Sequence, residues 1–81
     1  MTGGQQATAD EQIAALDAES VALAERKAAV EKQVRELMAA EDCRAGVYYA
    51  QEIFAAKQEK LVLETQLEIL RRRRNRLLAG Q

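Results

Sequence analysis

Five arginines in six positions, with Asn75 among them, form the strongest candidate for a ligand-binding site (residues 71–76). Guanidinium groups recognise phosphates and carboxylates through paired hydrogen bonds, so the cluster can pair with acids of the chain itself, or bind an acidic protein or a nucleic acid. Successive residues of a helix step by about 100°, so the five side chains cannot share one surface. We expect Arg72 and Arg76 to face outward toward an external anion, and Asn75 is the one candidate reader of a base.

Residue types that perform catalysis are scarce. Histidine, the commonest general base and metal ligand, is absent, and no phosphate-binding glycine loop or nucleophile motif occurs. Glu64 and Glu68 share a helical face, but we expect both to be solvated. Cys43 is the single cysteine, so we expect an exposed thiol without a redox or metal-binding role. The sequence predicts no enzyme activity, no cofactor, no metal and no small-molecule substrate.

Composition indicates an all-α chain. The 81 residues include no proline, four glycines and three aromatic residues, and helix-forming residues dominate. Thirteen acidic residues against twelve basic ones give no overall preference for a polyanion or a membrane. No apolar run approaches the length of a membrane span, and the first residues lack the pattern of a signal peptide. We therefore expect a cytoplasmic protein that does not contact a membrane.

Two helical patterns meet at a polar stretch containing Gly46, where a helix-ending glycine is expected. A capping box at Thr8 and Glu11 predicts the start of the first helix. The opening MTGGQQ resembles part of an epitope tag derived from a phage capsid protein, and we expect it to be disordered. The expected segments are a lead-in (1–7), a first helix (about 8–41), a turn (about 42–46), a second helix (about 47–79) and a tail (80–81).

Apolar residues recur in heptads along both segments, which fits either one continuous helix in a parallel coiled coil or two helices folded back as a hairpin. Charge favours the hairpin, because residues 1–25 contain five acids and no base, whereas residues 70–81 contain five arginines and no acid. A parallel pair would stack each arginine cluster on its own copy. The expected seam positions are Ile13, Leu16, Leu23, Val30, Val34 and Leu37, and then Tyr49, Ile53, Ala56, Leu63, Leu67, Leu70 and Leu77.

The hairpin register predicts which charged residues flank the seam. If paired residue numbers add up to about 90, acids of the first helix meet bases of the second, and such pairs select orientation more than they add stability. The predicted pairs are Asp17 with Arg71, Glu19 with Arg73, and Glu31 with Lys57.

The second helix has more apolar surface than one neighbouring helix can cover. Beyond its seam it carries a second set of large side chains: Phe54, Leu61, Val62 and Ile69. Burying each is worth roughly 1.5 to 3 kcal/mol, so this face predicts either dimerisation into a four-helix bundle or a surface for another protein's helix. Tyr48, at the start of the helix, is a further candidate contact.

The sequence thus predicts a non-enzymatic protein-interaction module: an adaptor, assembly chaperone or regulator that self-associates and presents apolar helical faces to a protein. Its layout is similar in broad form to small secretion-system co-chaperones and to phage scaffolding or regulatory hairpins, a likeness of architecture that involves no specific motif. Two alternatives stay open. One is a nucleic-acid-associated protein that uses the arginine cluster, and the other is a purely structural parallel coiled coil.

Overall fold

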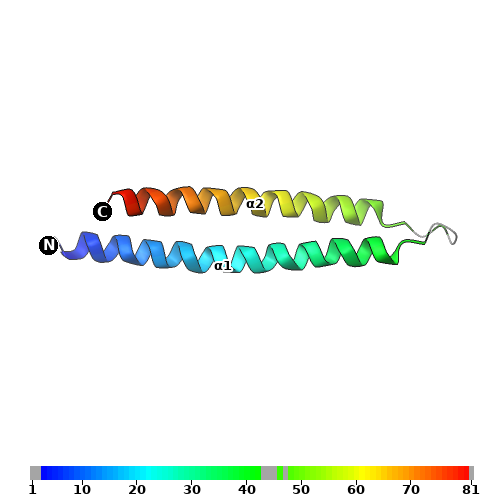
Figure 1. The fold of residues 1–81 in the computed structure, drawn as a ribbon, viewed down its shortest axis with the longest axis horizontal. Coiled ribbons are helices and arrows are strands. Elements are labelled where there is room, and N and C mark those ends of the chain that lie inside the picture. Colours follow the sequence, from blue (N-terminus) through cyan, green and yellow to red (C-terminus); the bar gives the residue numbers. More distant parts are fainter. Residues whose placement is uncertain (1–2, 43–45, 47, 81) are drawn as a thin grey trace.

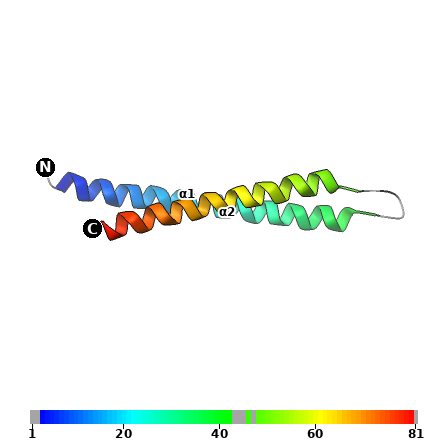
Figure 2. The same ribbon diagram turned by 90° about the horizontal axis from the view of Figure 1, so that it is seen from above.

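The computed structural model shows two long helices that run in opposite directions and pack along their length (Figure 1). α1 spans Gly3–Ala40 and α2 spans Ala50–Ala79. Both chain ends lie at the same end of the molecule, and the view of Figure 2 shows the helices crossing at a small angle. The predicted all-α hairpin is confirmed, and the continuous helix is not formed.

The structure describes residues 3–42, 46 and 48–80, with the backbone alone for residues 3–7. Cys43 and part of the predicted turn therefore lie outside the described residues. Within the described part, neither helix contains an apolar stretch long enough to cross a membrane.

The helix boundaries differ from those expected. α1 begins at Gly3, so Thr8 lies within the helix and does not cap it, because nothing between the two residues interrupts a helix as a proline would. α2 begins at Ala50, with Tyr49 as an N-cap that makes no side-chain hydrogen bond. The connection is consequently longer than the predicted turn.

Among the described residues between the helices, Gly46 has a backbone conformation that favours glycine. Its φ angle is 71°, in the left-handed region, and no atom would meet an added Cβ. The residue is therefore needed for its backbone conformation and not for close packing. Gly80, which ends α2, has a φ of −77° and is an ordinary right-handed residue.

The molecule is a thin rod, 69 Å by 14 Å by 13 Å between Cα atoms. It is longer than the roughly 50 Å expected for two helices of 33 residues, because the 38 residues of α1 alone span about 57 Å at 1.5 Å per residue.

A small core runs along the seam between the helices. The buried side chains are Val30, Ala56, Leu63 and Leu70. Val30 contacts both Ala56 and Leu63 in one cluster, against which Leu23 and Val34 also pack. All six stand at heptad positions predicted to form the seam, so the hydrophobic pattern located the core correctly.

Charged residues interrupt the seam at Lys27, Lys60 and Arg74, each of them half-buried. The two lysines extend their ammonium groups to the edge, where Glu64 Oε1 lies 3.5 Å from Lys27 Nζ and 3.9 Å from Lys60 Nζ. Long aliphatic stems cover the apolar seam while their charged ends remain in water. Such polar layers cost stability and fix the register of the two helices.

Candidate functional site

The side of α2 that faces away from α1 is apolar. Phe54, Leu61, Val62 and Ile69 are 44% to 64% exposed, and helical geometry places them roughly opposite the buried residues of the seam. We call these four residues the outward face. Tyr48, two residues before the start of α2, is also exposed. The predicted second apolar surface therefore lies in solvent in the single chain.

Charged side chains separate the outward face from the seam on both flanks of α2. Lys57 and Glu64 occupy one flank and Glu59 the other. Arg26 of α1 holds Glu59 in an ion pair of 2.6 Å. Because of these flanks, the outward face is a surface distinct from the core and not its exposed margin.

The outward face is hollowed around Thr65, whose hydroxyl donates a hydrogen bond of 3.0 Å to the Leu61 carbonyl. The hollow has a volume of about 350 Å³ and is lined entirely by α2: Leu61, Glu64, Thr65, Glu68, Ile69 and Arg72. This depression is shallow and open to solvent.

The outer side of α1 differs in character from that of α2. It carries exposed alanines, together with Val21, which is 58% exposed. Small side chains bury little area when covered, so they offer less binding energy than the large residues of α2. The strongest apolar candidate surface is therefore on α2.

Three of the five arginines of the cluster hold carboxylates of the chain itself. Arg71 and Arg72 each lie 3.3 Å from Glu68 Oε1. Arg74 Nε donates to Asp17 Oδ1 at 2.7 Å, which ties the end of α2 to α1. Among the described residues, the ion pairs of the cluster leave out Arg73 and Arg76.

An acidic residue of α1 does pair with an arginine of α2 near the helix ends, but the partners differ from those predicted. Asp17 pairs with Arg74 and not with Arg71, which turns to Glu68 three residues earlier on its own helix. A carboxylate one turn away needs little ordering of either side chain, so it is favoured over a partner across the seam. Arg72, expected to face an external anion, is paired with Glu68 for the same reason.

The other two predicted pairs are also not formed among the described ion pairs. Glu31 is half-buried and Lys57 exposed, and Glu19 and Arg73 line a common groove without pairing. The pair of Lys27 with Glu64, which sequence reasoning missed, obeys the predicted register and could have been found from it. The pair of Arg26 with Glu59 departs from that register, because both side chains are long enough to reach along the seam.

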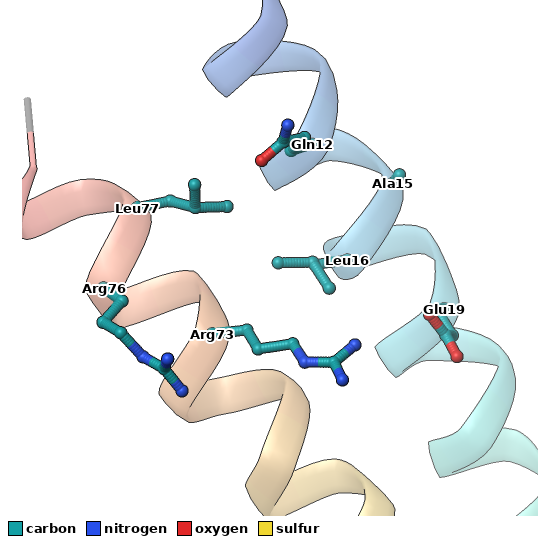
Figure 3. Close-up of a pocket in the computed structure, with 7 residues that line it drawn as sticks. All are labelled: Gln12, Ala15, Leu16, Glu19, Arg73, Arg76 and Leu77. Atoms are coloured by element: carbon teal, nitrogen blue, oxygen red, sulfur yellow. The ribbon is translucent and has the colours of Figure 1, made fainter.

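A groove opens between the two helices near the chain ends (Figure 3). We call it the end groove; its volume is about 510 Å³. Leu16 and Leu77 point toward each other across it, and Arg73 extends toward α1. The lining residues are Gln12, Ala15, Leu16 and Glu19 from α1, and Arg73, Arg76 and Leu77 from α2.

Neither a metal-ligand cluster among the described residues nor a known relative points to a function for this chain. No group of three or more metal-ligating residues is gathered within the part of the chain that the structure describes. Comparisons with protein-family models, with curated proteins and with solved structures find no match. The candidate binding surfaces of the chain are therefore the outward face and the end groove.

Proposed function

We propose that this chain is a non-enzymatic protein-interaction module that pairs with a second copy of itself through the outward face of α2. The paired hairpins then act as an adaptor, assembly chaperone or regulator for another protein. The observation that carries the proposal is the outward face, whose four large apolar side chains lie on the side of α2 away from its only helical neighbour.

The exposed surface area of the chain is consistent with a binding partner on the outward face. A compact monomer of 9.0 kDa is expected to expose about 4,900 Å², whereas the chain exposes 6232 Å². The excess of about 1,300 Å² follows from the elongated shape and leaves room for the roughly 800 Å² that each partner contributes to a stable interface. With four buried residues among those described, the single chain has a small core and a large exposed surface available for association.

The spacing along the outward face fits a second copy that runs antiparallel. When the two α2 helices cross near Leu61 and Val62, these residues meet their own counterparts in the central layer. Phe54 then shares a layer with Ile69 of the second copy at each end, so the face complements itself, as a twofold interface requires. A parallel arrangement would bring each Arg72 against its counterpart.

The charged flanks determine the form of the assembly. A four-helix bundle with a common core needs apolar residues beside the seam, where this chain has Lys57, Glu59 and Glu64. We therefore propose a layered assembly, with the two α2 helices at the centre and an α1 helix on each outer side. The outer surfaces of α1 and the chain ends stay available to a protein partner.

The nucleic-acid alternative receives less support from the charges. Arg71, Arg72 and Arg74 already hold carboxylates, and the chain has a net charge of −1. A nucleic-acid surface usually presents a continuous stripe of unpaired cations.

A disulfide cross-link tests the proposed interface. In a Cys43→Ser background, Val62→Cys is expected to form a covalent dimer on mild oxidation, because residue 62 lies beside its counterpart at the centre of the interface. Ala22→Cys, an exposed position on the outer side of α1, serves as the matched control and should stay monomeric on a denaturing, non-reducing gel. Equal cross-linking at both positions would show random collision and contradict the proposal.

A further inference from the structure

We propose that the end groove binds a short acidic peptide segment of another protein, with one large apolar side chain of that segment inserted between Leu16 and Leu77. This site is separate from the outward face and does not depend on self-association. Three features of the groove support this ligand: its apolar walls, its two arginines and its position between the ends of the two helices (Figure 3).

The apolar part of the groove is formed by Leu16 and Ala15 of α1 and Leu77 of α2. Leu16 and Leu77 are half-buried and point into the space between the helices. The groove is open to solvent, and its volume of about 510 Å³ is large enough to receive one apolar side chain. An inserted leucine or phenylalanine would remove apolar surface from water on both sides, which is the favourable term for binding.

The charged part of the groove is formed by the two arginines that lack a carboxylate partner among the described residues. Arg71, Arg72 and Arg74 are held by Glu68 and Asp17, whereas Arg73 and Arg76 line the groove. Glu19 is the one carboxylate in the lining, against two arginines. Arg73 extends toward α1, whereas Arg76 lies along α2 at the edge of the groove (Figure 3). An acidic group of the ligand, next to its apolar side chain, would pair with Arg73 or Arg76 on the α2 side of the groove.

A peptide fits this lining better than a nucleic acid. No aromatic side chain lines the groove, so a base would find no stacking partner. Gln12 supplies an amide that can both donate to and accept from a peptide backbone. Glu19 would repel a phosphate chain that passed along α1, whereas a peptide can place its acids on the α2 side only.

Fluorescence anisotropy of a short fluorescein-labelled peptide, in which leucines are separated by glutamates, tests the site. The full chain is expected to bind this probe. Peptides with glutamine in place of glutamate, or alanine in place of leucine, should bind at least about fivefold more weakly, because each removes one of the two contacts. No binding of the parent probe at low ionic strength would overturn the proposal.

Two double variants locate the binding on the chain. Arg73→Gln/Arg76→Gln is expected to weaken binding of the labelled peptide about tenfold. Arg71→Gln/Arg72→Gln makes the same charge change in the same cluster and should weaken binding less than about twofold. Equal losses of affinity in the two variants would show that the peptide is attracted to the cluster as a whole, which contradicts a groove site. Tighter binding of a single-stranded oligonucleotide than of the peptide would also contradict it. Sedimentation of both variants should show an unchanged mass, which separates this site from the outward face.

Discussion

Replacing Phe54 with aspartate is expected to convert the assembly into single chains of 9.0 kDa. Phe54 is 64% exposed in the hairpin, so the change should leave the seam intact, yet it removes a phenylalanine from each half of the proposed interface. Losing two such side chains costs roughly 3 to 6 kcal/mol, which raises the dissociation constant at least about 100-fold. Equilibrium sedimentation over a range of concentrations measures the change.

Val21→Asp provides the matched control for this experiment. Val21 is as exposed as the outward face but lies on α1, so the same added charge should leave the mass of the assembly unaltered. Ile69→Asp should repeat the effect of Phe54→Asp, since the two positions share layers of the interface. If Phe54→Asp and Val21→Asp had the same sedimentation behaviour as the unaltered chain, the outward face would not be the interface.

The second large effect is expected at the core, from Val30→Asp. Val30 is 1% exposed and contacts Ala56 and Leu63. The change would remove the apolar contacts of Val30 and bury a carboxylate in the seam, one turn from Lys27, which costs about 2 to 4 kcal/mol. Proteins of 81 residues have a free energy of unfolding of only about 4 to 12 kcal/mol. Most of the helical circular dichroism should therefore be lost at temperatures where the unaltered chain is folded.

Val21→Asp is again the comparison, because it makes the same chemical change nine residues earlier on the same helix, where the valine is 58% exposed. Its free energy of unfolding should change by less than about 0.5 kcal/mol, as is usual for surface substitutions. Thermal unfolding of the two variants at one concentration gives the difference. Similar midpoints for both would contradict the packing of Val30 in the seam.

The seam could be predicted from the sequence because it rests on periodicity. Val30 and Leu63 stand at heptad positions, and burial at those positions is fixed as soon as the two helices pack. The outward face could be predicted for the same reason, since Phe54 and Ile69 lie on another side of a helix whose period is known. Whether a second chain covers the outward face depends on how strongly two chains associate, so the dimer stays a prediction.

Ion-pair partners and helix ends could not be predicted equally well. Arg71 and Arg72 have flexible side chains, and the nearby Glu68 competes successfully with acids across the seam. The start of α1 at Gly3 was missed because the sequence contains a capping signal at Thr8 but no residue that stops the helix before it. The end groove was missed because it depends on the spacing between two helix ends, which no heptad pattern specifies.

The most direct test of the central claim is a distance measurement between copies of the chain. A nitroxide spin label at Asn75→Cys, in a Cys43→Ser background, should give an inter-copy distance of about 40 Å by double electron–electron resonance. That value follows from antiparallel α2 helices that cross near residues 61 and 62, at 1.5 Å per residue. A distance below about 20 Å would indicate a parallel pair, and the absence of any inter-copy distance would indicate a monomer. Either result would contradict the proposed assembly.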